Sequence, residues 1–352
     1  MRDSVSHRQS SETACPPLPR TQPAGGGGLW AGLLLTGGIA GFALTLHWFA
    51  LVPGLSPLIL AIAIGMAIGN GWGVPVQAKA GITFSIKRLL RIAVALLGLQ
   101  LTIGQVIEVG ATGLAIIAAS LVATFVFTIW AGRRLGIDRR LTELIGAGTA
   151  VCGASAVIAA NTVSAARDED VAYAVACVTV FGSLSMLLFP LLPGLLQLDA
   201  QAYGLWAGAA IHEVAQVVAA AFQGGQAAGE YGTIAKLSRV MMLAPLVLVL
   251  GVYVARRNTA GGRRPAAKPP LPWFVFGFIL LMVAGSVFPV PEAAKAGIGQ
   301  VTTFLLCLSL AAMGLETDVR KLWGKGARPL LLGAAAWLFI SVFSLILVKL
   351  VY

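Results

Sequence analysis

Apolar residues follow one another along most of this chain in runs of membrane-spanning length, separated by short polar or charged stretches. A helix needs about 20 apolar residues to cross a bilayer core of about 30 Å. The runs are continuous and do not alternate with polar positions, which favours helices over strands. We therefore predict eleven transmembrane helices, over residues 29–50, 54–69, 86–107, 111–131, 141–161, 170–191, 203–222, 233–255, 272–288, 298–316 and 328–350.

The composition leads to the same class. Hydrophobic residues make up 58% of the chain and charged residues 11%, whereas soluble domains carry about 25% charged residues. The expected fold is an all-α polytopic membrane protein with discontinuous core helices. We predict a polar, disordered cytoplasmic tail over residues 1–28, because it is rich in Pro and Gly, and one transmembrane transporter domain over residues 29–352.

The positions of Lys and Arg predict the orientation, because cytoplasmic loops carry an excess of positive charge. Most of the 25 Lys and Arg residues fall in the tail or in every second loop. We expect a bacterial inner membrane protein with its N-terminus in the cytoplasm and its C-terminus outside. These loops account for the net charge of +11, so no nucleic acid partner is expected. The cations placed outside are Arg167, Lys236, Arg239, Lys295 and Lys349.

Cysteine usage adds no site to this picture. The four cysteines, Cys15, Cys152, Cys177 and Cys307, show no CxxC motif and no Cys/His spacing typical of a metal site. Neither a disulfide framework, a metal nor a cofactor is expected.

A glycine-rich polar stretch, residues 146–161, occupies the predicted helix 141–161. Gly148, Cys152 and Ser155 share one helix face, and Thr149 and Gly153 lie beside them. One interpretation is a close helix contact between small residues. The other is a broken helix whose free N–H groups and positive dipole end bind an anion. Both interpretations are compatible with the residues.

The predicted helix 203–222 carries His212, Glu213 and Gln216. Ionisable residues in a membrane helix are usually functional. A histidine that is only hydrogen-bonded to a neighbour is the alternative, but a His beside a Glu, with a Gln one turn on, favours proton or substrate handling. We predict Gln216 as a substrate contact and His212 and Glu213 as proton-coupling groups.

Other polar residues are expected to reach the same cavity. Gln100 and Asn161 are candidate substrate contacts, and Glu316 is a third candidate for proton coupling. Lys236 and Arg239 are expected at the outer entry of the helix 233–255, where they either snorkel to the surface or attract an anion.

Two pairs of segments resemble each other within the chain. Residues 89–102 match residues 305–318 at an offset of 216, and the predicted helices would run in opposite directions, as in the inverted repeats of secondary transporters. Chance similarity between Leu-, Ala- and Gly-rich helices is the alternative. The helices 141–161 and 203–222 also match, at an offset of 60. They would run parallel if the helix 170–191 between them crosses fully, and so would not form an inverted pair. We therefore interpret this second match as composition.

Five stretches, in this order, resemble the YeiH-type family of bacterial inner-membrane proteins, which is labelled as a sulfate exporter family. The resemblance covers roughly residues 30–350. It implies a polytopic secondary transporter, related to the antiporter and bile-acid-symporter folds with crossing broken helices. The stretches are residues 96–100, 146–156, 212–220, 236–240 and 313–315.

These observations predict a secondary active exporter of a small anion such as sulfate, sulfite or a sulfonate, working by alternating access and coupled to protons. A cation/proton antiporter using Glu213 is the alternative. A zinc protease would need His-Glu-x-x-His, but position 216 is Gln. An intramembrane serine protease would pair Ser155 with His212, and we expect no enzyme. The expected partners are the anion and the lipid bilayer, with a homodimer left open.

Overall fold

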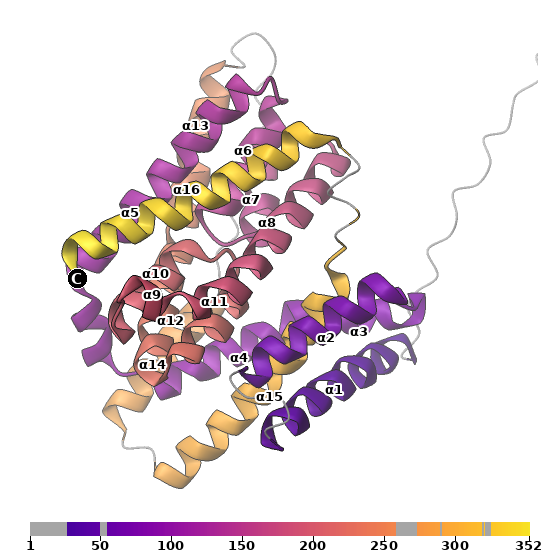
Figure 1. The fold of residues 1–352 in the computed structure, drawn as a ribbon, viewed down its shortest axis with the longest axis vertical. Helices are drawn as coiled ribbons and strands as arrows, with labels where there is room; N and C mark the ends of the chain where they lie inside the picture. The colour runs from indigo at the N-terminus through magenta and orange to yellow at the C-terminus, as the bar shows by residue number, and fades with distance from the viewer. Residues whose placement is uncertain (1–26, 50–54, 258–272, 289–290, 319, 321–324) are drawn as a thin grey trace, which may run out of the picture.

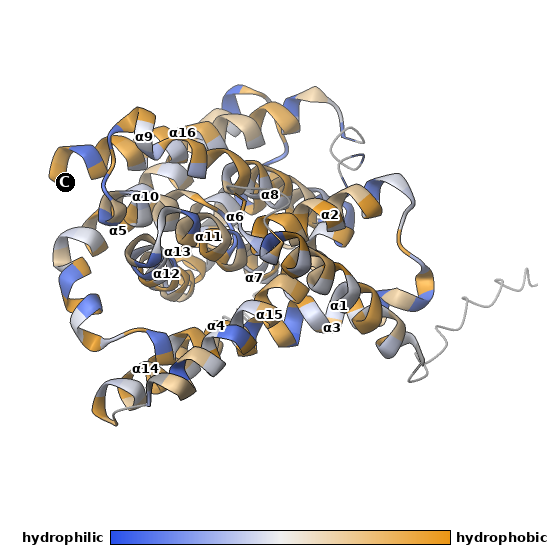
Figure 2. Cartoon of the chain, turned by 60° about the horizontal axis from the view of Figure 1, so that its bottom comes forward, coloured by the Kyte–Doolittle hydropathy of each residue, from blue (hydrophilic) through white to orange (hydrophobic). Residues whose placement is uncertain are grey.

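The structure is a computed structural model that describes residues 27–49, 55–257, 273–288, 291–318, 320 and 325–352 (Figure 1). These residues form helices and no strand, which confirms the all-α class. Most of each helix is hydrophobic (Figure 2), and six of the described helices are long and apolar enough to cross a membrane. The predicted tail lies outside the described residues as far as residue 26, and the first helix begins at Gly27.

The helices pack into two bodies. We call the first the α15 body, and in Figure 1 its helices α1, α2, α3 and α15 lie together in the lower part of the view, with α15 to the left of the other three. Gly65 and Gly314 let α2 and α15 approach closely, since a Cβ on Gly65 would lie 2.4 Å from the Ala311 oxygen. Its helices are α1 (Gly27–Trp48), α2 (Pro57–Gly71), α3 (Lys79–Phe84), α4 (Leu90–Leu97), α14 (Trp273–Val287) and α15 (Glu292–Glu316).

We call the second the hairpin body. Its main contacts with the α15 body run through α11, which touches α2, α4 and α15, and through α5 against α14. Its helices are α5 (Ile103–Arg134), α6 (Arg139–Ala150), α7 (Ala154–Ser164), α8 (Asp168–Leu188), α9 (Pro193–Leu196), α10 (Ala200–Ala210), α11 (Val214–Ala221), α12 (Gln226–Met241), α13 (Leu243–Arg257) and α16 (Ala327–Val351).

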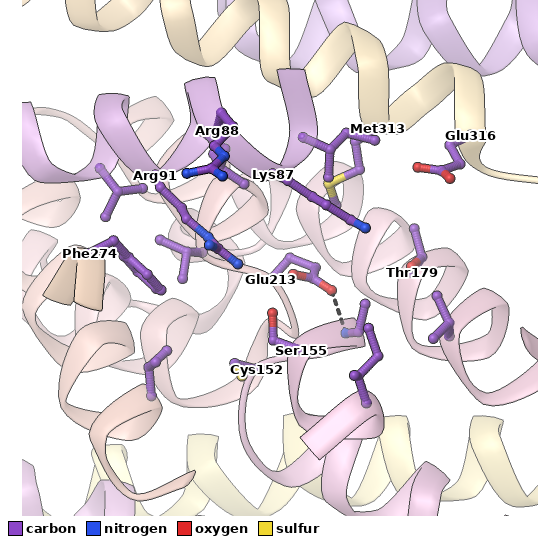
Figure 3. A pocket seen from close by; sticks show the side chains of 18 of the residues that line it. Lys87, Arg88, Arg91, Cys152, Ser155, Thr179, Glu213, Phe274, Met313 and Glu316 are labelled. Atoms are coloured by element: carbon purple, nitrogen blue, oxygen red, sulfur yellow. Dashed lines mark hydrogen bonds between the residues drawn. The ribbon is translucent and has the colours of Figure 1, made fainter. Parts of the chain in front are cut away.

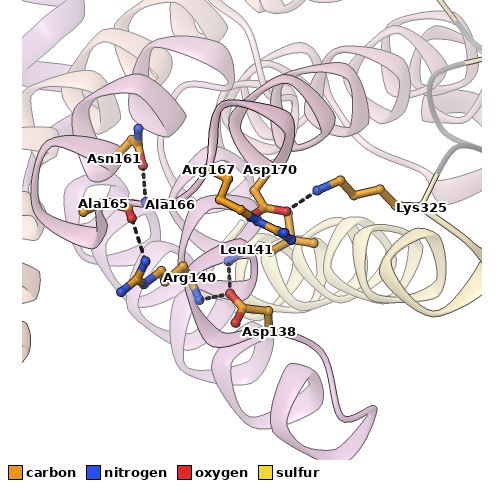
Figure 4. Close-up of polar contacts among 9 residues, drawn as sticks. All are labelled: Asp138, Arg140, Leu141, Asn161, Ala165, Ala166, Arg167, Asp170 and Lys325. Carbon is orange, nitrogen blue, oxygen red and sulfur yellow. Dashed lines mark hydrogen bonds and ion pairs between the residues drawn. The ribbon is translucent and has the colours of Figure 1, made fainter. Parts of the chain in front are cut away.

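The predicted helix 141–161 folds back on itself as the α6–α7 hairpin. Near the start of α6, Arg140 Nη1 donates to the Ala165 carbonyl just after α7 at 3.0 Å (Figure 4). One turn further, Ser164 Oγ donates to Glu143 Oε2 at 2.7 Å. A straight helix rising 1.5 Å per residue would place residues 143 and 164 about 30 Å apart. The two ends of this segment therefore lie on one side of the molecule.

The predicted helix 203–222 folds back in the same way, as the α10–α11 hairpin. The Tyr203 hydroxyl, near the start of α10, donates to the Ala220 carbonyl, near the end of α11, at 2.9 Å. Gly224 lies against the Tyr203 ring, because a Cβ there would be 2.5 Å from Tyr203 Cδ1. Both ends of the second segment also share one side.

The two hairpins enter from opposite sides because α8 runs between them. At the start of α8, Asp170 pairs with Lys325, which precedes α16, and with Arg167 (Figure 4). We call this the basic side, because α5 also ends there with Arg133 and Arg134. On the opposite side, Gln223, just after α11, accepts from the Ser56 N–H at 2.9 Å.

These hairpins correct the predicted topology. The segments 141–161 and 203–222 are not crossings, so the count of eleven crossings does not hold. Arg167, predicted outside, lies on the basic side with the other loop cations, which strengthens the asymmetry of positive charge. Removing two crossings leaves an odd number, so the two termini are still expected on opposite sides of the membrane. The orientation with the N-terminus in the cytoplasm stays a prediction.

The hairpins also correct the interpretation of the repeats. The first breaks over residues 151–153 and the second over residues 211–213, which are the positions that the offset of 60 aligns. Because the hairpins enter from opposite sides, the two matched segments are inverted, as in transporter repeats. The interpretation of this match as composition is therefore wrong. The repeat at an offset of 216 stays a prediction.

Labelling of introduced cysteines tests this topology. In a Cys15→Ser background, Arg134→Cys and Glu169→Cys are expected to react with a membrane-impermeant thiol reagent from one side, and Gln201→Cys and Gln226→Cys from the other. The native cysteines among the described residues are all buried, and Cys15 lies outside them. Two full crossings would instead place 134 opposite 169, and 201 opposite 226, and that pattern would refute the hairpins.

Candidate functional site

The tips of the two hairpins meet in the interior. Glu213 Oε1, in the break between α10 and α11, accepts a hydrogen bond from the Ala154 N–H, the first residue of α7, at 2.7 Å. Gly153 permits this contact. Its φ is 70°, and a Cβ there would lie 2.0 Å from Glu213 Oε1. The predicted broken helix with a free N-terminus is confirmed, and a carboxylate of the other hairpin lies against it.

Two cations of α12 hold the ends of α6 and α10. Lys236 Nζ donates to the carbonyls of Val151 and Ile211, both at 2.8 Å. Arg239 donates to the Ala150 carbonyl at 2.6 Å and also to those of Thr149, Ala209 and Ile211. The last carbonyls of a helix lack intrahelical partners and carry a partial negative charge. These two side chains satisfy the carbonyls of both tips at once.

The expected position of Lys236 and Arg239 at an outer entry is wrong. Both side chains are 0% exposed, and their donors point at backbone carbonyls. Close packing of α10 on α12 brings them there, because Gly208 stands where a Cβ would lie 2.6 Å from the Gly232 oxygen. Sequence reasoning placed these residues by the length of the apolar run and could not foresee that two helix ends converge on them.

Gln216 and His212 lie behind the tips. Gln216 Oε1 accepts from the Glu213 N–H at 3.1 Å, and its Nε2 donates to Ser183 Oγ at 3.2 Å, so it fixes the second tip to α8. His212 is 1% exposed and its Nδ1 has no hydrogen-bond partner. It packs against Gly182, also on α8. The structure gives no hydrogen bond between His212 and Ser155.

A cavity of about 810 Å³ opens in front of the tips, between the two bodies. Cys152, Ala154, Ser155 and Glu213 contribute the wall on the hairpin side. Figure 3 shows Glu213 directed at the α7 N-terminus, with Ser155 and Cys152 beside it. Four predicted site residues line this cavity, namely Cys152, Ser155, Glu213 and Glu316.

Three cations form the opposite wall. Lys87, Arg88 and Arg91 line the cavity and extend into it from the helix above the tips in Figure 3. None of the three has a hydrogen bond or ion pair with any residue that the structure describes. Lys87 and Arg88 lie on a π-helical turn, Ser85–Leu89, between α3 and α4, and such turns are frequent at functional sites. We call these residues the cationic wall.

The cationic wall was missed at the sequence level. The prediction began a helix at residue 86 and assigned Lys87, Arg88 and Arg91 to the cytoplasmic boundary, as topological charge. The structure instead begins this helix at Lys79, which puts Arg91 about 18 Å from its start at 1.5 Å per residue. The signal was present, since Arg91 follows Lys87 by four residues and Arg88 by three within an apolar run, which places it on the same side of a helix as both.

Acidic residues occupy one end of the same cavity. Glu316 and Asp318, at the end of α15, line it and also a second cavity of about 520 Å³. The second cavity includes Lys79 and Arg320, and Arg320 Nη2 donates to the Asn70 carbonyl. Glu316 is exposed and lies apart from Arg91 in Figure 3. The cavity is therefore polarised between a basic wall and an acidic end.

The remaining candidates lie outside the cavity lining. Gly148 is a packing residue, because a Cβ there would lie 2.7 Å from Val157 Cγ2. Thr149 is 1% exposed and offers its carbonyl to Arg239. Asn161 Oδ1 accepts from the Ala166 N–H at 2.8 Å and so caps the end of α7 (Figure 4). Gln100 lies beside Gly299 of α15. No cluster of three or more metal-ligating side chains occurs among the described residues.

Comparison with known proteins gives consistent matches. Residues 31–333 match the family described as conserved hypothetical protein 698. The UPF0324 membrane protein of Pseudomonas aeruginosa is 39% identical over 350 residues, covering 95% of this chain and 97% of its own. The UPF0324 inner membrane protein YeiH of Salmonella typhi is 38% identical over 325 residues, covering 88% and 91%. The comparison with solved structures found no match.

Proposed function

The chain belongs to the UPF0324 family of membrane proteins, and we propose that it is a secondary active transporter of a small oxyanion such as sulfate, sulfite or a sulfonate. We place it in the bacterial inner membrane, as the name of the Salmonella typhi relative suggests, with its basic side in the cytoplasm. A polytopic helical protein with two opposed hairpins fits transport, because such breaks are where transporters bind substrates.

One observation carries the choice of an anion. Lys87, Arg88 and Arg91 are charged, lack partners among the described residues, and face a cavity inside a membrane protein. Their side chains are exposed where they line this cavity, and three cations gathered on one wall raise the local concentration of anions, which favours an anion site. Arginine suits this role because its planar guanidinium matches an oxyanion with two parallel hydrogen bonds.

The opposite wall supplies further donors. The Ser155 hydroxyl and the N-terminus of α7 face the same cavity, and a helix N-terminus attracts negative charge through its free N–H groups. An oxyanion between the two walls would contact both bodies. His212, Glu213 and Glu316 stay candidates for proton coupling, although only Glu213 and Glu316 line the cavity.

The arrangement in two bodies supplies a route for alternating access. The cavity lies between the α15 body and the hairpin body, and their main contacts run through α11, α5 and α14. A displacement of one body against the other would expose the hairpin tips to the two sides in turn, while Lys236 and Arg239 hold the tips together. Rigid-body motion of this kind is the usual basis of alternating access.

Counterflow of labelled sulfate into proteoliposomes tests the proposal. We expect uptake by the wild type and a loss of at least about tenfold for Arg91→Gln combined with Lys87→Gln, because charge-assisted hydrogen bonds contribute about 1.5–3 kcal/mol each. The matched control is Lys349→Gln, which removes an exposed cation far along α16.

Two results would reject the anion assignment. One is wild-type counterflow that the double variant leaves unchanged while the protein stays folded. The other is sodium-dependent proton flux without anion counterflow, which would support the cation/proton antiporter. Sulfite and a sulfonate, each tested as a competitor of labelled sulfate, would identify the preferred oxyanion.

A further inference from the structure

We propose that the Glu213 carboxylate is a tethered substitute for the transported anion: it occupies the anion's place at the start of α7, and it must be protonated and leave before an anion binds there. This inference rests on the proposed anion transport. It assigns Glu213 a specific action, competition with the substrate for one set of donors.

The contact between Glu213 and α7 has the form of a bound anion. Its Oε1 accepts from the Ala154 N–H at 2.7 Å, a length typical of a charge-assisted hydrogen bond. Glu213 belongs to the other hairpin, 59 residues along the chain, so this contact joins two distant segments, although the same residue also caps the start of α11. Glu213, Ala154 and Ser155 all line the cavity, so a soluble oxyanion can approach the same donor.

The backbone at Glu213 is held by contacts that do not involve the α7 N-terminus. Gln216 fixes the Glu213 N–H and is itself bonded to α8. The Ile211 carbonyl, two residues before Glu213, is bonded to Lys236. The carboxylate accepts from the Ala154 N–H of the other hairpin and also forms a capping box with Gln216 at the start of α11. A change of side-chain rotamer can therefore release Ala154 without moving the tip.

The cations around Glu213 do not neutralise it. Lys236 and Arg239 stand behind the tips, but their donors are taken by backbone carbonyls. Cys152 lies on the first tip beside it. Across the cavity stand Lys87, Arg88 and Arg91, with Glu316 and Asp318 at the acidic end. No ion pair joins Glu213 to any of these described residues, so its charge is balanced mainly by the α7 N-terminus.

Competition follows from the charges. Two anions cannot share one donor set inside the membrane without strong repulsion. An entering oxyanion therefore finds this donor set free only after Glu213 has been protonated and has left it. One proton is then bound with each anion, and linkage requires the apparent affinity to rise as the pH falls, by up to tenfold per pH unit above the titration of Glu213.

Binding of sulfate to the purified full-length protein in nanodiscs, measured by calorimetry between about pH 5 and about pH 8, tests the inference. The wild type is expected to bind sulfate more tightly as the pH falls. Glu213→Gln and Glu213→Ala remove the competing charge, so both are expected to bind about tenfold more tightly than the wild type at the high end of the range and with little pH dependence. Glu169→Gln, which alters an exposed carboxylate at the start of α8 outside the cavity lining, is the matched control and is expected to keep the wild-type profile.

The outcomes separate this inference from the proposed function. If the wild type binds sulfate equally at every pH, or if Glu213→Gln weakens binding, the substitution of Glu213 for the anion is refuted while anion binding stands. If Glu316→Gln flattens the profile and Glu213→Gln does not, the proton acts elsewhere and the inference fails. If no variant binds sulfate, sulfite or a sulfonate at any pH, the proposed function and the inference fall together.

Discussion

Replacing Arg239 by methionine is expected to destabilise the protein more than any other single change considered. Methionine keeps the aliphatic bulk but leaves the carbonyls of Thr149, Ala150, Ala209 and Ile211 without this donor. Each orphaned buried group costs about 1–3 kcal/mol, and the negative ends of α6 and α10 would then face each other uncompensated. Lys236→Met, which orphans two carbonyls, is expected to have a smaller effect of the same sign.

Thermal unfolding of the purified variants by intrinsic fluorescence measures this effect. Lys349→Met changes an exposed lysine on α16 and is expected to unfold like the wild type. Arg239→Lys keeps the charge but loses the planar fork that reaches both tips, so an intermediate stability is expected. If Arg239→Met unfolds at the wild-type temperature, the assignment of Arg239 as the clamp of the two hairpin ends is wrong.

The second large effect is expected for Gly153→Ala. The new Cβ would overlap Glu213 Oε1, at 2.0 Å, and alanine is strained at a φ of 70°. Backbone strain and overpacking each cost about 1–3 kcal/mol, so we expect a loss of about 3 kcal/mol or more. The variant would also push Glu213 off the Ala154 N–H, which separates the two hairpin tips.

A second substitution distinguishes the two causes. Glu213→Ala removes the overlapping side chain, so Gly153→Ala in that background is expected to destabilise the protein by the backbone strain alone. The matched control is Gly194→Ala, since a Cβ there would meet nothing within 4 Å and α9 is short. Equal losses from Gly153→Ala in both backgrounds would show that the contact with Glu213 does not constrain this glycine.

The two hairpins could not be predicted from the local pattern of apolar residues alone. Each hairpin contains two short helices whose combined length matches one membrane crossing, and an apolar run does not record whether the chain continues or turns back. Gly153 indicated the first break, because a glycine in a polar, glycine-rich stretch favours an interrupted helix. The match at an offset of 60 indicated the second break, since it aligns the ends of α6 and α10. This match was interpreted as composition because two full-length helices separated by one crossing would run parallel.

The candidate site was anticipated on one wall and missed on the other. Cys152, Ser155 and Glu213 were selected because polar and ionisable residues are costly in lipid, and all three line the cavity. Arg91 and its neighbours were set aside because charge near a predicted helix end is normally topological. Lys236 and Arg239 were expected at a helix entry, but they are buried and their partners are backbone carbonyls of two distant segments.

The sequence by itself determined the class of this protein: continuous apolar runs, scarce charge and cations gathered in alternate loops can satisfy the backbone only as helices in a membrane. It also marked the polar positions, because each costs free energy in lipid. Tertiary structure alone decided what those positions do. Whether a cation faces an open cavity or the carbonyl end of a broken helix depends on which segments meet in space. Ala154 meets Glu213, and Arg239 meets Ala150 and Ala209, through folds that no local period encodes.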